Sequence, residues 1–368
     1  MKKRYIIVPA MLAALFACGI IFSEPIGTMV TQLKDTLAPA VEEVLSSPSP
    51  DPVQPDVQPW DFYIWQSSHF SDQTLTVSLP AEDARPRISL SAPSLSPGRE
   101  YLMLTIDTPS GKELERETLH PGSGRPFSGS IRVPKTTEDS LRLSVYYNGE
   151  KYGSYRNWFY GEVKLSRTAT GWKIEKPPAY DGNIALYSQP KDMKKATRAT
   201  MYIQKNSEQI KSLAREITQG AADDYQKLLL IHDWVTEHIY YDTDRIDSGK
   251  LNDLRTTEQV LADKKGVCED FANLTAALCR SIDIPCAVVA GDAPSAPSDQ
   301  WVATDEEKPN HAWNEALVDG RWVILDTTWD AGKVYENGKY KEKRPKSWTY
   351  FDPTLSLFSC GHRMMEYL

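Results

Sequence analysis

The hydrophobic pattern of this 368-residue chain changes its period at about residue 178. Before that point, short runs alternate apolar and polar residues and are separated by Gly, Pro, Asn and Ser, which is typical of half-buried β-strands. After it, apolar residues recur every three or four positions, as they do on one face of an α-helix. A chain of this length suits two domains, and the change of period predicts an all-β domain followed by an α+β domain.

Residues 60–178 are predicted to form a β-sandwich of the immunoglobulin-like kind. Strand-like runs such as RISLSA (87–92) and YLMLTID (101–107) recur at a spacing of roughly ten residues, with no helical segment between them. The dipeptide Asn148-Gly149 is a strong signal for a two-residue hairpin turn. No motif in this region carries chemistry, so a candidate site is expected in residues 179–368.

The first 22 residues have the features of a signal peptide or an N-terminal membrane anchor. A positive stretch at residues 2–4 precedes an apolar run, 5–22, that is long for a cleaved signal and just long enough to span a bilayer. Lipidation of Cys18 is an alternative, although the apolar run continues past it. Residues 23–59, which end in a proline-rich run, are predicted to be a stalk and linker. We therefore expect an extracellular or cell-surface protein, secreted or tethered, that meets a membrane only through this segment.

The net charge of −8 argues against a nucleic-acid-binding protein, which would carry a basic stripe. The basic run at 339–346 is interrupted by Glu342 and is predicted to be a solvated loop. Disulfides are not expected to hold the protein together, because the cysteines that follow Cys18 all lie in the last third of the chain. Cysteines and histidines never cluster at ligand spacing, so neither a metal nor a cofactor is expected.

Helical periodicity is clear in three segments that precede Cys268. SEQIKSLAREITQG (207–220) ends in a glycine that suits a helix stop, and DDYQKLLLIHDWVTEHIYYD (223–242) has acids at its start. Thr256 and Gln259 have the spacing of a capping box at the start of the third helix.

Cys268 lies at the N-terminal end of a fourth predicted helix, whose buried stripe comprises Phe271, Leu274, Thr275 and Leu278. Unpaired N–H groups and the positive end of the helix dipole stabilise a thiolate there. The same N–H groups can receive the oxyanion of an acyl-transfer intermediate. The neighbouring carboxyl groups of Glu269 and Asp270 oppose the thiolate, so a positioned histidine must supply most of the activation.

That histidine is predicted from a hairpin at residues 310–330, NHAWNEALVDGRWVILDTTWD. The dipeptide Asp319-Gly320 favours a two-residue type I′ turn, and this turn fixes which residues face one another. His311 and Asp326 become diagonal cross-strand neighbours, roughly 5–8 Å apart at Cβ, which lets the carboxylate orient the imidazole as in a catalytic triad. The register places four side chains on one face: His311, Trp313, Asp326 and Thr328.

These segments resemble the core of the transglutaminase-like superfamily. GVCEDFANLTAALCRSIDIP, HAWNEALVDGRWVILDTTWD and YFDPTLSLFSCGHR occur in the expected order, and the resemblance covers about 180–368. It implies a papain-like α+β fold in which a helix bearing the cysteine packs on a sheet bearing the histidine and the aspartate. By matching position it implies that Cys268 is the nucleophile, His311 the general base and acid, and Asp326 the residue that orients the imidazole.

The remaining cysteines and histidines are predicted to be structural. Cys279, Cys286 and Cys360 are expected to be small core residues, with a Cys279–Cys286 or Cys286–Cys360 bridge as the alternative. Packing or surface roles are expected for His232 and His238, and His362 is expected to cap or pack the terminal segment. A glycosidase-like pair of Asp326 and Asp330 would leave the cysteine and the histidine unexplained.

The sequence thus predicts an exported enzyme that transfers acyl groups from amide or peptide bonds through a thioester on Cys268. Hydrolysis, as in a peptidase or amidase, is favoured over transamidation, because nothing in the chain marks an amine-acceptor site. The expected partner is a protein or peptide substrate, such as one of the cell envelope. The alternative is a non-catalytic binding or scaffold protein at the cell surface that uses the same fold.

Overall fold

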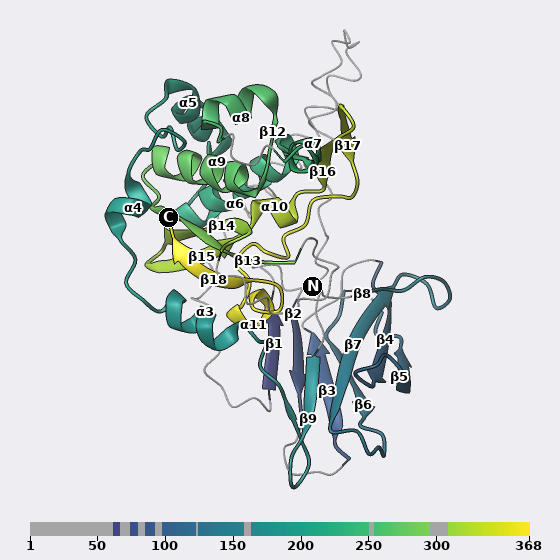
Figure 1. The fold of residues 1–368 in the computed structure, drawn as a ribbon. Helices are drawn as coiled ribbons and strands as arrows, with labels where there is room; N and C mark the ends of the chain where they lie inside the picture. The colour runs from purple at the N-terminus through teal and green to yellow at the C-terminus, as the bar shows by residue number, and fades with distance from the viewer. Residues whose placement is uncertain are drawn as a thin grey trace, which may run out of the picture. The chain divides into compact units, whose positions relative to one another are not determined.

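Figure 1 shows a computed structural model of the chain. The structure describes residues 62–66, 74–79, 85–92, 98–122, 124–157, 163–249, 254–294 and 308–368. The predicted export segment, Cys18, the stalk and the linker lie outside the described residues. Within the ranges that are described, no helix has the length and apolar character needed to cross a bilayer.

The first part of the described chain consists of antiparallel β-strands in two sheets. One sheet has the order β1-β2-β3-β6 and contains β1 (Phe62–Gln66), β2 (Thr74–Ser78), β3 (Arg87–Ala92) and β6 (Phe127–Arg132). The other sheet has the order β10-β9-β7-β4-β5 and contains β4 (Tyr101–Asp107), β5 (Glu113–Leu119), β7 (Ser140–Asn148), β9 (Val163–Arg167) and β10 (Trp172–Ile174). The short strand β8 (Arg156–Asn157) pairs with β7.

Alternation of apolar residues is the reason that these segments form strands. In β3, Ile88, Leu90 and Ala92 are buried while the residues between them are exposed, as a period of two requires. Buried residues of both sheets belong to one hydrophobic cluster that includes Val77, Leu90, Leu104, Leu143 and Leu165. The predicted β-strands are therefore present, with a common core.

A hairpin forms at Asn148-Gly149 as predicted, between β7 and β8, but its connection is longer than a two-residue turn. Asn148 still pairs with Tyr101 in the β4–β7 ladder, which keeps the chain extended to that point. On its other edge β7 pairs Tyr147 with Arg156, so the connection runs over residues 148–155. The ladder to β4 outweighs the local turn preference of the dipeptide.

The second part of the described chain is mixed α and β. Its helices are α3 (Tyr180–Tyr187), α4 (Met193–Thr197), α5 (Glu208–Ile217), α6 (Asp224–His238), α7 (Thr243–Asp247), α8 (Thr257–Asp263), α9 (Cys268–Ser281), α10 (Thr327–Asp330) and α11 (Leu355–Phe358). One antiparallel sheet has the order β15-β14-β13-β18, with β13 (Cys286–Asp292), β14 (His311–Val318), β15 (Arg321–Leu325) and β18 (Arg363–Tyr367). The predicted succession of β-sheets and a mixed α and β domain is confirmed.

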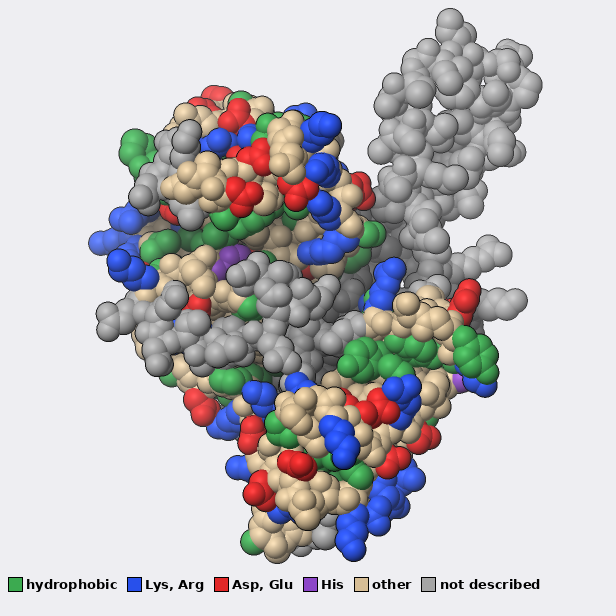
Figure 2. Space-filling view, turned by 45° about the vertical axis from the view of Figure 1, so that its right-hand side comes forward, with side chains coloured by type: hydrophobic (Ala, Val, Ile, Leu, Met, Phe, Trp, Pro, Cys, Tyr) green, Lys and Arg blue, Asp and Glu red, His purple; other side chains and the backbone are tan. Residues whose placement is uncertain are grey.

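A smaller sheet has the order β12-β11-β16-β17 and contains β11 (Tyr240–Asp242), β12 (Lys265–Gly266), β16 (Lys333–Glu336) and β17 (Lys339–Glu342). The basic run at 339–346 thus begins as a strand, because residues 333–342 form a hairpin that the charge pattern alone did not reveal. Lys341 and Lys343 both form ion pairs with Glu336, at 2.7 and 3.0 Å. On the face shown in Figure 2, basic and acidic side chains are interspersed over the described residues.

The helix α9 is buried on all sides, although its sequence predicted an amphipathic helix. It lies on β13 and β14 and is contacted by α5, α6, α8 and α10 (Figure 1). Every residue from Asp270 to Arg280 is buried. The small side chains of Ala272, Ala276 and Ala277 let the neighbouring elements approach closely where a polar face was expected. The N-terminus of α9 is therefore held rigidly within the domain.

Candidate active site

Cys268 is the first residue of α9, as predicted, and the residues around it fix where the helix begins. The Asp270 carboxylate accepts a hydrogen bond from the Val267 N–H at 2.9 Å and forms a buried ion pair with Arg245 at 2.5 Å. At Gly266 a Cβ would collide with the Cβ of Asp270, so only glycine fits there. Asp270 was predicted to oppose the thiolate, and in the structure its carboxylate caps the helix.

His311 is the first residue of β14 and pairs with Gly291 of β13. Its Nε2 atom lies 2.7 Å from Oδ2 of Asp326, and the His311 side chain is 8% exposed. The predicted turn is confirmed, since Asp319 and Gly320 both have positive φ, at 50° and 79°, as a type I′ turn requires. The strand pairing also follows the predicted register from Val318↔Arg321 outward.

The predicted pairing holds up to Leu325 and fails at Asp326. The β14–β15 ladder ends at Asn314↔Leu325, and Asp326 becomes the N-cap of α10, where its Oδ1 accepts hydrogen bonds from the N–H groups of Thr328 and Trp329. Thr328 therefore lies in a helix and does not share a strand face with His311. The helix cap pulls the chain out of the sheet, yet it leaves the Asp326 carboxylate in reach of the imidazole.

The Cys268 thiol completes the group. It lies close enough to His311 to raise the pKa of the imidazole, and since Nε2 of His311 is bonded to Asp326, Nδ1 is the nitrogen left for the thiol. Burial lowers the pKa of His311, but the charge and hydrogen bond of Asp326 and the proximity of Cys268 outweigh it and raise the pKa to about 10. Burial acts to raise the pKa of Asp326, and the two histidines beside it hold that pKa far below its usual range. The structure thus brings all three predicted residues together.

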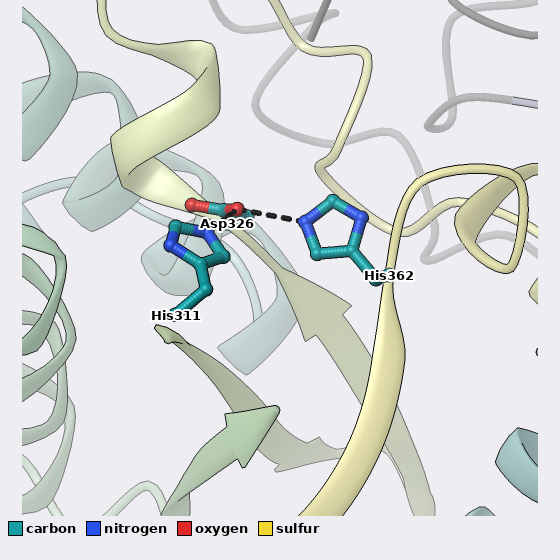
Figure 3. Close-up of side chains that lie close together, drawn as sticks. All are labelled: His311, Asp326 and His362. Carbon is teal, nitrogen blue, oxygen red and sulfur yellow. Dashed lines mark hydrogen bonds and ion pairs between the residues drawn. The ribbon is translucent and has the colours of Figure 1, made fainter. Parts of the chain in front are cut away.

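A second histidine contacts the same carboxylate. Nε2 of His362 lies 3.0 Å from Oδ2 of Asp326, and the His362 side chain is fully buried (Figure 3). The ring stacks on Phe358 with 4.0 Å between centroids, so the predicted packing role is present as well. The contact with Asp326 was not predicted, because the two residues are far apart in sequence and no spacing rule links them.

Tyr241 is another neighbour of the thiol that the sequence did not reveal. It lies in β11 opposite Gly266, two residues before Cys268, and its ring packs against Phe271 with 6.5 Å between centroids. Burial raises the pKa of the Tyr241 hydroxyl, and negative charge on Cys268 and Asp326 raises it further. The hydroxyl is therefore a neutral donor that lies close to the candidate nucleophile.

The other polar residues considered in the sequence have structural partners. Asp330 is fully buried and bonds Nε2 of His232 at 3.0 Å, while Nδ1 of His232 lies 3.2 Å from Asp233. His232 is thus a buried structural residue held by two carboxylates. Asp330 is engaged with His232 and does not form a catalytic carboxylate pair with Asp326. His238 is exposed at the end of α6.

The four cysteines that the structure describes are not joined in disulfide bonds. Cys279 and Cys286 are buried and interact, and this interaction and burial raise the pKa of Cys279 well above its ordinary value. The Cys360 thiol lies 3.4 Å from the carbonyl oxygen of Ser356. None of these three has the helix position or the histidine partner of Cys268.

The donor atoms of His311, Asp326 and His362 lie within 4.8 Å of one another, the kind of spacing that a metal ion can bridge. In this structure both imidazole Nε2 atoms already bond the same carboxylate oxygen, at 2.7 and 3.0 Å. These hydrogen bonds connect the three groups through one carboxylate oxygen, as in a hydrogen-bonded catalytic group.

A comparison with known protein families agrees with the geometry. The family model described as "Transglutaminase-like superfamily" matches residues 211–327. The kyphoscoliosis peptidase of Mus musculus is 27% identical over 125 residues, which cover 34% of this chain and 19% of the mouse protein. The kyphoscoliosis peptidase of Homo sapiens is 28% identical over 122 residues, which cover 33% of this chain and 18% of the human protein. This chain therefore spans less than a fifth of the length of these relatives.

Two solved structures are also similar. A candidate cysteine protease from Cytophaga hutchinsonii matches with a TM-score of 0.31 and 16% identity, over 77% of this chain and 88% of that one. A candidate protease from Parabacteroides distasonis matches with a TM-score of 0.24 and 11% identity, over 74% of this chain and 69% of that one. The family match includes the helix of Cys268 and the hairpin of His311 and Asp326. Residues 211–327 of this chain form a domain of the transglutaminase-like superfamily.

Proposed function

We propose that this chain is a cysteine-dependent acyl-transfer enzyme that acts on amide or peptide bonds, with hydrolysis as its main outcome. The observation that carries the proposal is the hydrogen bond between His311 and the buried Asp326, next to Cys268 at the start of α9. Nucleophile, base and orienting carboxylate in this order form the minimal apparatus for a thioester mechanism. The name of the mouse and human relatives supports peptide hydrolysis.

In the proposed first half-reaction, the Cys268 thiol gives its proton to Nδ1 of His311, and its sulfur attacks the carbonyl carbon of the substrate. The carbonyl electrons move to oxygen, and the oxyanion accepts hydrogen bonds from N–H groups at the start of α9. When the intermediate collapses, the C–N bond breaks and the His311 imidazolium protonates the leaving amine. The acyl group then remains on sulfur as a thioester.

In the second half-reaction, water replaces the amine. His311 removes a proton from the water as its oxygen attacks the thioester carbonyl, and the C–S bond breaks to release a carboxylic acid. The proton returns to the Cys268 sulfur. A primary amine that enters instead of water would give transamidation with the same proton movements. Asp326 stays ionised throughout and stabilises the imidazolium that forms in each half.

Tyr241 is the side chain best placed to act as a second oxyanion donor. Its hydroxyl is close to Cys268, is kept neutral, and has no hydrogen-bond partner among the residues that the structure describes. An oxyanion that develops beside the thiol would provide that partner. Removal of one such donor typically costs about 100- to 1,000-fold in rate.

The proposal extends to the fold and the location of the protein. We propose that the α and β domain is papain-like and that the two N-terminal sheets form an immunoglobulin-like sandwich, which the shared core of the sheets supports. We also propose that the protein is exported through its first 22 residues and acts at the cell surface. A protein or peptide of the cell envelope is the proposed class of substrate.

The function is tested by alkylation of the full chain with iodoacetamide at pH 6–7, in the presence of EDTA and with the labelled residues mapped by mass spectrometry. We expect preferential labelling of Cys268 that is lost in His311→Ala, with Cys360, the other partly exposed described cysteine, as the internal comparison. Equal and slow labelling of Cys268 and Cys360 would instead favour the non-catalytic scaffold. A peptide library assayed for cleavage and for incorporation of a fluorescent amine then separates hydrolysis from transamidation.

A further inference from the structure

His362 is held in one orientation by contacts with several elements. Its ring is stacked on Phe358 at an interplanar angle of 14°, and the Trp329 ring lies 4.3 Å away between centroids. The backbone is fixed too, because the His362 N–H donates to the Phe358 carbonyl at 2.9 Å and its own carbonyl accepts from the buried Asn183 amide at 2.8 Å. The imidazole therefore cannot turn away from Asp326 without disturbing this packing.

The hydrogen bonds determine which nitrogen of His362 carries the proton. Asp326 is ionised and can only accept, so Nε2 of His362 must be the donor to Oδ2. The other nitrogen, Nδ1, is buried and has no partner among the described residues. A proton on Nδ1 would be an unsatisfied buried donor, so the neutral Nε2–H tautomer fits the site.

Electrostatics distinguish the two histidines that share the carboxylate. Their ring centroids are 5.6 Å apart, so two imidazolium charges would repel in this buried site. Burial is the main cause that lowers the pKa of His362 to about 4, and the charge of His311 lowers it further. The hydrogen bond to Asp326 and the charge of Asp326 act in the opposite direction but are outweighed. His362 thus remains neutral, and of the two rings it is His311 that favours the charged form.

We propose that His362 is a positioning residue of the active site, which holds Oδ2 of Asp326 against Nε2 of His311 by a hydrogen bond from a neutral Nε2–H. This inference rests on the proposed function of Cys268 and His311. Oδ1 of Asp326 is already fixed by two backbone N–H groups, and His362 fixes the second oxygen. His362 also lies beyond residues 211–327, so this support for the triad comes from outside the segment that the family model matches.

The test compares two variants of nearly equal size, His362→Gln and His362→Met, in the full chain. The Gln side chain can place an amide N–H close to the position of Nε2, whereas Met fills the same space without a donor. Both lose the stacking on Phe358, so the pair isolates the hydrogen bond. The readouts are the rate of iodoacetamide alkylation of Cys268 from pH 5 to 10 and the Tm of each variant.

We expect His362→Met to shift the midpoint of the pH profile upward by one unit, so that alkylation at pH 6 slows about tenfold, and His362→Gln to stay within about threefold of the wild type. The Tm should fall to a similar extent in both variants. If the two variants have the same pH profile, His362 is only a packing residue and the inference is overturned. If wild-type Cys268 shows no enhanced, His311-dependent reactivity, the proposed function fails before His362 is tested.

A measurement on the unmodified protein covers the case in which a variant does not fold. Nitrogen-15 NMR of the histidine rings should show the His362 ring in the neutral Nε2–H form at pH 7, and its signals are assigned by their loss in whichever of His362→Gln and His362→Met folds. A His362 that is protonated on Nδ1 at pH 7, alone or as imidazolium, would contradict the inference.

Discussion

Asp326 accepts four hydrogen bonds, two on each oxygen, and none of its neighbours alone explains its position. The backbone of α10 fixes one oxygen and two histidines share the other. A fully buried carboxylate with this many donors is strongly stabilised in its charged form. Its charge in turn favours the imidazolium form of His311, which is the form that pairs with a thiolate.

The titration of His311 should report this coupling. Because the charge of Asp326 is the largest effect that raises the pKa of His311 to about 10, Asp326→Asn should move the NMR titration midpoint of His311 well below 10. Cys268→Ala should lower the midpoint less, since the thiol is a smaller cause. A midpoint that is the same in the wild type and in Asp326→Asn would contradict the assigned electrostatics.

Tyr241→Phe should separate the two kinds of reaction at Cys268. Alkylation by iodoacetamide forms no oxyanion, so its rate should not change. Acylation of Cys268 by 4-nitrophenyl acetate does form one, and its burst rate should fall about 100-fold. Equal effects on both reactions would mean that the Tyr241 hydroxyl acts on the thiol and not on the oxyanion.

At the level of elements, the entry to α9 is the feature that places the nucleophile. The chain passes from β12 into the helix at Gly266, Val267 and Cys268, and the Asp270 side chain folds back over the glycine. Because α9 is buried on all sides, it cannot shift to accommodate a larger residue at this point. The position of the thiol is thus tied to the absence of a side chain at Gly266.

Gly266→Ala should therefore destabilise the protein by about 2 kcal/mol, the cost of overpacking a rigid core. It should also slow alkylation of Cys268 by displacing the cap. Gly182→Ala is the matched control, because a Cβ at this exposed helical position meets nothing within 4 Å. Chemical denaturation of both variants checks the difference, and equal stabilities would show that the collision is relieved at no cost.

At the level of the whole molecule, a buried charged group connects α6 with the segment that follows Asp326. His232 lies between Asp233 and Asp330, and Asp330 also accepts hydrogen bonds from the backbone N–H of Tyr350. Burial lowers the pKa of His232, but the two carboxylates outweigh it and raise the pKa to about 9. The imidazolium therefore contributes to the stability of the fold.

The sign of this contribution sets its pH range. Because the pKa of His232 is raised in the folded protein, its stabilisation is complete below about pH 6.5, the ordinary histidine value, and is lost as the pH rises through about 9. The Tm should fall between pH 7 and pH 10, and His232→Asn should remove part of that fall. His238→Asn, an exposed residue of the same helix, should leave it unchanged. Identical pH profiles in all three proteins would contradict a charged His232.

The sequence predicted the parts of the fold that depend on local periodicity and turn chemistry. The capping box at Thr256 and Gln259 is present at the start of α8, and the β14–β15 register follows from Asp319-Gly320 as far as Leu325. The strand β5 was not predicted, since its residues, ELERETL, are mostly exposed and have no apolar face. It lies at the end of its sheet, where charged side chains discourage pairing with other chains.

The sequence alone determined which residues could form the site, because a cysteine at a helix start and a histidine and an aspartate in one hairpin are locally encoded. Only the tertiary structure decided how those residues are held. The departure of Asp326 from the strand depends on a helix cap, and the contacts of His362 and Tyr241 join segments far apart in the chain. Periodicity describes one element at a time, whereas such contacts depend on how several elements pack.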